Sequence, residues 1–209
     1  MRIERFIAIA SFVVITGPGL LSAAEGAGPA ERSEVTWRQV DHHSPQEGSP
    51  SLGPPGAGTT LLFYTDYQCP VCPRAARELP RLVAELDGML RVEFRHNPLT
   101  MHRSALDAAA ASRAAQRQGR FWEYHELLLQ SRRFDRETLV ALAERLSLHR
   151  DSFVRDLDDL ALRDGILAEA EQARSAGAEA TPGFLIKGKV QVGWGSYPQI
   201  RDFVRKNLQ

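Results

Sequence analysis

Cysteine is scarce in this chain. Only two cysteines, Cys69 and Cys72, occur among its 209 residues, and two residues separate them. This count excludes a scaffold held together by several disulfides, as found in small secreted domains. A bridge between these two cysteines would close a very short loop and add little stability, because the entropic gain grows with loop length. We therefore expect the pair to do chemistry rather than to staple the fold.

An excess of charge of one sign is also absent. Lysine and arginine together number 26, aspartate and glutamate number 26, and the formal net charge is zero. Binding to nucleic acid needs a basic face, and nothing in this balance points to one. With 43% hydrophobic and 25% charged residues, the composition is that of a globular protein with a buried core.

The apolar stretch Phe6–Ile15 is too short to span a bilayer comfortably. Arg2 and Arg5 precede it, and small residues at positions 22–24 follow it. This order is typical of a secretory signal peptide, which we assign to residues 1–24. An uncleaved N-terminal membrane tether is the alternative. We expect an exported, periplasmic protein, in a compartment where disulfides form and persist.

Glycine and proline dominate the segment that follows. Residues 28–58 contain ten of them, about a third of the segment and far above their usual share. We predict that residues 25–58 form a flexible leader to the folded domain. Within it, Val35–Val40 alternates weakly and would add an edge strand.

The folded domain is predicted to occupy residues 59–209. Residues 59–65 are apolar and β-branched, as expected for a strand buried on both faces. A helical pattern runs from Arg74 to Leu86, and Arg91–Arg95 is a second strand. Strand, helix and strand in this order favour a parallel pair with a right-handed crossover.

A block of helical patterns then interrupts the strands, at about residues 102–177. Strands return as a hairpin at 184–187 and 190–192, and residues 197–208 form a last amphipathic helix. The predicted fold class is therefore α/β, with an all-helical subdomain inserted into a central sheet.

The two cysteines lie between the first strand and the first helix, at Cys69-Pro70-Val71-Cys72. At the N-terminal end of a helix, free N–H groups and the macrodipole favour a thiolate over a thiol. Such motifs lower a cysteine pKa to roughly 3.5–7.5. A second thiol within reach then closes a disulfide and expels the captured group, which is the minimum equipment for thiol–disulfide exchange.

Four segments, in this order, resemble those of DsbA-like thioredoxin-fold proteins. They are Phe63–Cys72, Phe94–Leu99, Ala108–Leu128 and Ala178–Phe184. The resemblance extends over roughly residues 59–208, and together these motifs are much more specific than a lone CxxC. It implies a thioredoxin-like central sheet with a helical insertion.

The resemblance also implies roles for individual residues. Cys69 would be the exposed nucleophile, Cys72 the buried resolving thiol, and Pro182 a cis-proline beside the disulfide. The backbone of Thr181 would pair with an extended substrate strand. On sequence alone, an ordinary trans turn at Thr181-Pro182 is equally open. Pro70 would support the same site.

Two residues depart from the family pattern. If Cys69 caps the helix, Pro73 falls at the fourth helical position, where it cannot donate the first intrahelical hydrogen bond. Val71 stands where the strong oxidants of the family carry histidine, and it offers the Cys69 thiolate neither a charge nor a side-chain hydrogen bond. We therefore expect a less oxidising protein than those members.

Asp66, three residues before Cys69, is a candidate for proton transfer at the dithiol. The alternative is that it caps the following turn. Glu93, in the second strand, is a weaker candidate for the same role.

These observations predict an exported thiol:disulfide oxidoreductase that oxidises dithiols through a Cys69–Cys72 disulfide. It would need no metal and no cofactor besides that disulfide. Its partners would be reduced or misoxidised exported proteins and a membrane redox partner, quinone-linked or a reductase, and the protein would be a monomer. The alternatives are a disulfide reductase or isomerase, and a periplasmic metal-binding module that uses the CxxC as ligands.

Overall fold

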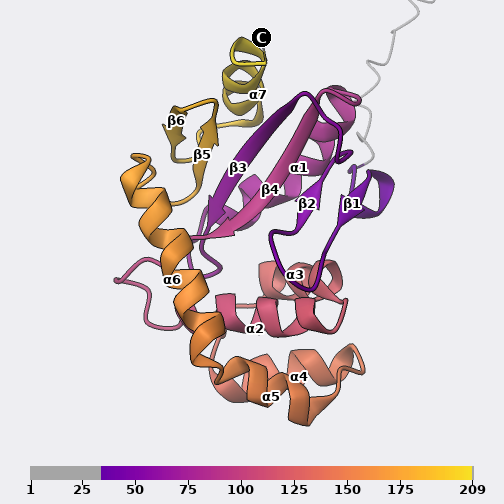
Figure 1. The fold of residues 1–209 in the computed structure, drawn as a ribbon, viewed down its shortest axis with the longest axis vertical. Coiled ribbons are helices and arrows are strands. Elements are labelled where there is room, and N and C mark those ends of the chain that lie inside the picture. The colour runs from indigo at the N-terminus through magenta and orange to yellow at the C-terminus, as the bar shows by residue number, and fades with distance from the viewer. Residues whose placement is uncertain (1–33, 209) are drawn as a thin grey trace, which may run out of the picture. The chain divides into compact units, whose positions relative to one another are not determined.

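The computed structural model describes residues 34–208. The predicted signal peptide at residues 1–24 and the first part of the leader, at 25–33, lie outside the described residues. Two strands form the centre of the structure, β3 (Thr59–Thr65) and β4 (Leu90–His96). They run parallel, with Leu61 opposite Val92 and Phe63 opposite Phe94. The predicted parallel pair is confirmed, and both strands lie in the middle of the sheet (Figure 1).

The sheet has the order β1-β2-β4-β3-β5-β6. The hairpin β5 (Gly183–Ile186) and β6 (Lys189–Val192) joins the free side of β3 antiparallel. Helix α1 (Cys72–Glu85) connects β3 to β4, and α7 (Tyr197–Lys206) follows the hairpin. These elements agree with the predicted order and bounds to within a few residues.

Side chains alternate across β3 and so divide the core into two layers. Phe63 points into a cluster with Leu79 of α1 and Val204 of α7. Tyr64 points the other way and packs against Ala173 of α6 (Leu160–Ser175). Helices α1 and α7 therefore cover one face of the sheet, and α6 lies across the other (Figure 1).

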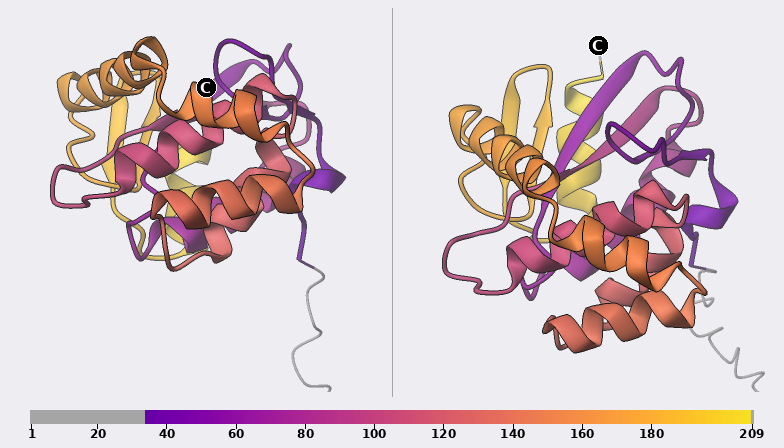
Figure 2. Two further views of the ribbon diagram at one scale, coloured as in Figure 1. Left: turned by 90° about the horizontal axis from the view of Figure 1, so that it is seen from below. Right: turned by 60° about the horizontal axis from the view of Figure 1, so that its bottom comes forward.

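The predicted helical insertion is present. Its first four helices gather at one end of the sheet, and its last helix, α6, runs from there along the face of the sheet (Figure 2). Its helices are α2 (Ala105–Arg117), α3 (Phe121–Gln130), α4 (Arg136–Arg145), α5 (Arg150–Leu157) and α6. Seven alanines of α2 are almost fully buried, and six of them belong to one cluster with leucines of α4 and α5. Small side chains let these helices approach closely, so α2 acts as the core of the insertion.

The prediction of a flexible leader up to residue 58 is wrong for its described part. Strands β1 (His42–His43) and β2 (Ser51–Leu52) extend the sheet, and β2 pairs antiparallel with β4. The edge strand expected at 35–40 is instead a 3-10 turn, η1 (Trp37–Gln39). Glycine here serves close packing: Gly53 has φ +88°, and a Cβ at this position would collide with the Leu90 carbonyl oxygen.

Candidate active site

The two cysteines lie in the turn between β3 and α1. The Cys69 N–H donates to the Asp66 carbonyl oxygen at 3.1 Å, and the Cys72 N–H donates to the Cys69 carbonyl oxygen at 3.3 Å. Cys72 is the first residue of α1, Val71 is its N-cap, and Pro73 is the second helical residue. Cys69 is therefore not the cap. Pro73 falls in the first turn, where an N–H has no intrahelical acceptor and its loss costs nothing.

Cys69 is the acidic thiol of the pair. A hydrogen bond from the Cys72 thiol is the largest cause that lowers the Cys69 pKa, to about 5. Burial opposes this shift, while the Thr181 side chain and the N–H groups of Val71 and Cys72 add to it. Cys69 is therefore a thiolate at neutral pH. The helix N-terminus contributes as the sequence predicted, but the neighbouring thiol contributes more.

Cys72 has the opposite character. Burial raises its pKa most strongly, and the adjacent Cys69 raises it further. The Cys72 side chain has no solvent-exposed surface. It therefore stays protonated and serves as the donor to Cys69, so the pair shares one proton in an asymmetric way.

Cys69 is less accessible than the resemblance implied. Its exposed fraction is only 5%. The expectation of an exposed nucleophile is therefore wrong, because Cys69 is buried. Its Sγ lies 3.4 Å from the Thr181 carbonyl oxygen, to which the thiol form donates. Of the four residues in the motif, Pro70 is exposed and Val71 is partly buried.

The loop before β5 closes the other side of the dithiol. The Thr181–Pro182 peptide bond is cis, as the resemblance implied. The Gly193 N–H donates to the Pro182 carbonyl oxygen at 2.8 Å and fixes the loop against the end of the hairpin. A Cβ at Gly183 would lie 3.0 Å from the Ala178 Cβ, so a larger residue here would have to displace Ala178. The fold thus brings Thr181 to Cys69 across 112 positions of sequence.

Asp66 is placed as a turn residue. Its carboxylate accepts from the Gln68 N–H at 2.8 Å and the Leu99 N–H at 3.0 Å, and it contacts His102 Nδ1 at 2.7 Å. The Asp66 side chain is fully buried. Its carboxylate oxygens are thus engaged by these three donors, whereas its backbone N–H faces Cys72 and lowers that pKa. The geometry favours the capping alternative over proton transfer.

Comparison with known proteins agrees with this geometry. Residues 45–206 match the thioredoxin family. That match spans strands β2 to β6, the dithiol turn, the helical insertion and the cis-proline loop. The chain belongs to the thioredoxin family.

Among solved structures, this chain is similar to a thioredoxin-like oxidoreductase from Silicibacter pomeroyi DSS-3. The TM-score is 0.68 and the identity is 27%, over 76% of this chain and 91% of the other. The thiol-disulfide exchange protein alpha-DsbA2 from Wolbachia pipientis has a TM-score of 0.65 and 20% identity, over 76% and 86% of the two chains. The predicted DsbA-like thioredoxin fold is confirmed.

Sequence relatives include larger proteins that carry a similar segment. A Na(+)/H(+) antiporter NhaA from Herminiimonas arsenicoxydans is 34% identical over 138 residues, which is 66% of this chain and 22% of the antiporter. The chain thus spans about a fifth of the length of such relatives. Between residues 34 and 208, no helix has the length and apolar character needed to cross a membrane.

Asn97 is a site residue that the sequence reading did not single out. Its N–H donates to the Thr65 carbonyl oxygen at 2.9 Å, and its side-chain Nδ2 donates to the Ala178 carbonyl oxygen at 3.1 Å. This one buried residue, through its backbone N–H and its side-chain amide, therefore joins the end of β3 to the segment that leads into the cis-proline loop. The signal available in the sequence was an Asn-Pro pair directly after a strand.

A buried polar cluster beneath the dithiol turn was also missed. The Tyr67 hydroxyl lies 2.7 Å from His125 Nδ1, and Ser112 Oγ lies 3.1 Å from His96 Nε2. Burial lowers the pKa of both histidines, that of His125 to about 3. The contact of His125 ties the turn to α3, and that of His96 ties the end of β4 to α2. Scattered along the sequence, the two histidines gave no pattern to recognise.

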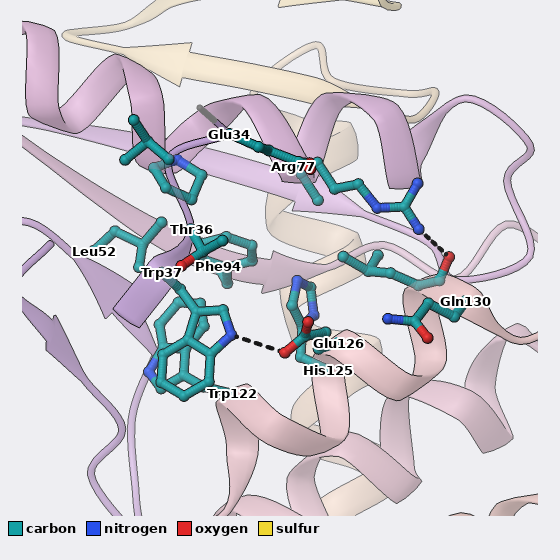
Figure 3. Close-up of a pocket in the computed structure, with 14 residues that line it drawn as sticks. Glu34, Thr36, Trp37, Leu52, Arg77, Phe94, Trp122, His125, Glu126 and Gln130 are labelled. Carbon is teal, nitrogen blue, oxygen red and sulfur yellow. Dashed lines mark hydrogen bonds between the residues drawn. The ribbon is translucent and has the colours of Figure 1, made fainter. Parts of the chain in front are cut away.

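A pocket of about 180 Å³ lies between residues 34–37, α1 and α3 (Figure 3). Trp37 stacks on Trp122 with ring centroids 6.0 Å apart, and its Nε1 donates to Glu126 Oε2 at 3.3 Å. Arg77 donates to the Leu129 carbonyl oxygen at 3.0 Å across the same junction. Neither cysteine lines this pocket, which belongs to the join between the sheet and the helical insertion.

Metal-ligating side chains are dispersed in the described part of the chain. No group of three or more histidine, cysteine, aspartate or glutamate residues within 34–208 is placed to hold a metal ion. Glu93, the weaker acid candidate, pairs with Arg95 at 2.9 Å on β4. Trp194 lies near Phe184, with ring centroids 6.3 Å apart, on the hairpin side of the cis-proline loop.

Proposed function

We propose that this protein is an exported thiol–disulfide oxidoreductase that oxidises pairs of thiols in other proteins. The observation that carries the proposal is the separation of the two cysteine pKa values, with Cys69 ionised and Cys72 protonated at neutral pH. A low-pKa nucleophile beside a buried resolving thiol is the arrangement that thiol–disulfide exchange requires.

The proposed cycle begins with the Cys69–Cys72 disulfide. A substrate thiolate attacks Cys69 Sγ, the Cys69–Cys72 bond breaks, and Cys72 leaves as a thiolate that takes up a proton. A second substrate thiolate then attacks the substrate sulfur of the mixed disulfide. Cys69 leaves as a thiolate and the oxidised substrate departs. The low Cys69 pKa favours this second step, because weaker bases leave faster.

Residues around the sulfurs would hold the substrate. The cis bond at Pro182 presents the Thr181 backbone next to Cys69 Sγ. An extended substrate segment would pair with this backbone, and main-chain pairing tolerates many substrate sequences. Pro70 and Val71 would contact the substrate from the other side. The substrates are proposed to be reduced or misoxidised exported proteins.

The direction of the reaction follows from how strongly the reduced form is stabilised. A Cys69 pKa of about 5 lies between those of thioredoxin, about 7, and of the strongest oxidants, about 3.5. We therefore expect a reduction potential between about −270 and −120 mV. Val71 contributes a backbone N–H but no polar side chain, which fits a potential more negative than that of the strongest oxidants, about −120 mV.

The cellular setting is part of the proposal. Residues 1–24 would direct export to the periplasm, and a membrane partner, quinone-linked, would return Cys69 and Cys72 to the disulfide. The protein would act as a monomer and without a metal. A reductase or isomerase role would use the same sulfurs with a different partner.

A peptide with two cysteines tests the proposal. Oxidised protein mixed with the reduced peptide should form the peptide disulfide and reduced protein in equal amounts, and Cys69→Ser should form neither. Titration against glutathione should place the potential in the stated interval. Failure of the oxidised protein to react with the peptide, or tight stoichiometric zinc or copper after purification, would contradict a dithiol oxidase.

A further inference from the structure

Thr65 closes β3, and the strand geometry directs its side chain toward the start of α1. Phe63, two positions earlier, packs with Ala75 and Leu79 of α1. Residues two apart on a strand point to the same face. Thr65 therefore faces α1 as well, one step closer to its first residue, Cys72.

The Thr65 hydroxyl is available as a donor. The residue is only 2% exposed, and its Oγ1 is buried without a hydrogen-bond partner in the reduced protein. An unpaired buried hydroxyl is unfavourable, so such a group is expected to gain a partner in another state of the site. Asp66 does not compete for this role, because its carboxylate is already held by three other donors.

We propose that the Thr65 hydroxyl donates a hydrogen bond to the Cys72 sulfur whenever that sulfur carries negative charge. This inference rests on the proposed dithiol chemistry. In the oxidising direction, Cys72 becomes negative as the Cys69–Cys72 bond breaks under attack by a substrate thiolate. In the reverse direction, the Cys72 thiolate attacks Cys69 Sγ of a mixed disulfide and releases the substrate as a thiolate. The same atom needs a donor in both steps.

The electrostatics of the site support this placement. Burial and the neighbouring Cys69 raise the Cys72 pKa, whereas the Asp66 N–H and the Thr65 hydroxyl lower it. Those two donors are thus the groups that offset the cost of a buried charge at Cys72. In contrast, the Thr181 side chain lowers the pKa of Cys69. The two threonines therefore stabilise negative charge on different sulfurs.

The test follows the two sulfurs separately. Reduced protein is mixed with an aromatic disulfide reagent that releases a coloured thiolate. The first release reports attack by Cys69, and the second reports attack by Cys72 on the mixed disulfide. Thr65→Val keeps the size and the β-branch but removes the donor, and Thr65→Ser keeps the donor. Thr59→Val is the matched control, because Thr59 is buried at the other end of the same strand and bonds the Leu208 carbonyl oxygen instead.

We expect Thr65→Val to slow the second release by a factor on the order of 3–10. The first release and the reduction potential should match those of Thr59→Val, and Thr65→Ser should restore the second release. The inference would be overturned if the second release were unchanged in Thr65→Val. It would also be overturned if both Thr65 variants slowed the first and the second release by the same factor. Disulfide transfer by the wild-type protein to the two-cysteine peptide tests the proposed function independently of these rates.

Discussion

Single residues set the reactivity of the dithiol by moving two similar thiols apart in acidity. The Cys72 thiol donates to Cys69, so the proton that one sulfur keeps is what stabilises the charge on the other. Thr181 and the N–H groups at the start of α1 add smaller contributions. The acidity of Cys69 is thus a property of the pair more than of the helix alone.

This dependence gives the first prediction. Alkylation of Cys69 in the reduced protein should follow a midpoint near pH 5, because the thiolate is the reacting form. Cys72→Ala removes the principal donor and should raise the midpoint, whereas Cys72→Ser retains a hydroxyl and should raise it less. The measurement is the rate of iodoacetamide incorporation against pH. A wild-type midpoint near pH 8.5, the value of a free cysteine, would contradict this account.

Asp66 gives a second prediction at the same scale. Asp66→Asn leaves one oxygen to serve donors that two oxygens now serve, and it turns an NH₂ group toward one of them. We expect a loss of roughly 1–3 kcal/mol in the free energy of unfolding, measured by denaturant titration. Asp87→Asn, at an exposed position, is the control and should change little.

The same variant separates the two roles considered for Asp66. If it serves only to hold the turn, the pH dependence of thiol exchange keeps its shape in Asp66→Asn. Loss of one limb of that pH profile would instead show that the carboxylate transfers protons.

Among the secondary-structure elements, those with a strong local pattern were predictable. Residues 59–65 form a mostly apolar strand, and residues 90–96 form a strand in which buried residues alternate with partly buried charged ones. Strands β1 and β2 were not, because each has two residues and is defined by its pairing partner rather than by its own pattern. Glycine and proline in that segment indicated flexibility, whereas Gly53 in fact permits a close backbone approach to β4.

The site was predictable to a similar extent. The CxxC spacing and the Thr181-Pro182 pair follow from local sequence. Asn97 and His125 join the site only through contacts between distant segments, and no spacing along the chain announces such contacts.

The segment around Trp37 gives a prediction at the scale of elements. Trp37 lies on Trp122 and its indole N–H bonds Glu126 of α3. Trp37→Ala should remove the stack and the hydrogen bond and cost roughly 1–3 kcal/mol of unfolding free energy, less than a fully buried tryptophan would. Asp41→Ala, an exposed change in the same segment, should have little effect. A Trp37→Ala protein as stable as this control would show that residues 34–40 do not support the fold.

In the molecule as a whole, the helical insertion is bound to the sheet by buried contacts. The Tyr67 hydroxyl of the dithiol turn is hydrogen-bonded to His125 of α3. The ring of Phe94, on β4, has its centroid 5.2 Å from the ring centroids of Trp122 and His125. Arg77 of α1 bonds the carbonyl end of α3. We therefore expect the sheet and the insertion to unfold together.

Because two histidines are buried in the neutral form, we predict that the whole molecule loses stability in acid. Burial is the main cause that lowers the pKa of His125 to about 3, with the charge on Arg77 adding to it. The folded protein thus binds fewer protons than the unfolded chain below about pH 6.5, so stability is lost as pH falls through that value. At pH 5, His125 alone should lower the free energy of unfolding by about 2 kcal/mol relative to neutral pH.

The test uses oxidised protein, in which Cys69 cannot titrate. Its free energy of unfolding is measured between pH 8 and pH 5. His125→Gln should flatten the decline, and the exposed His43→Gln should not. A level profile in the wild-type protein would refute the assignment.

The close contact between the two sulfurs should also protect Cys69 from irreversible oxidation. A thiolate such as Cys69 is the form that peroxides attack, and the first product is a sulfenic acid. With Cys72 against it, that product condenses to the Cys69–Cys72 disulfide and releases water before a second oxidation can occur. Reaction with peroxide would thus regenerate the Cys69–Cys72 disulfide instead of inactivating the protein.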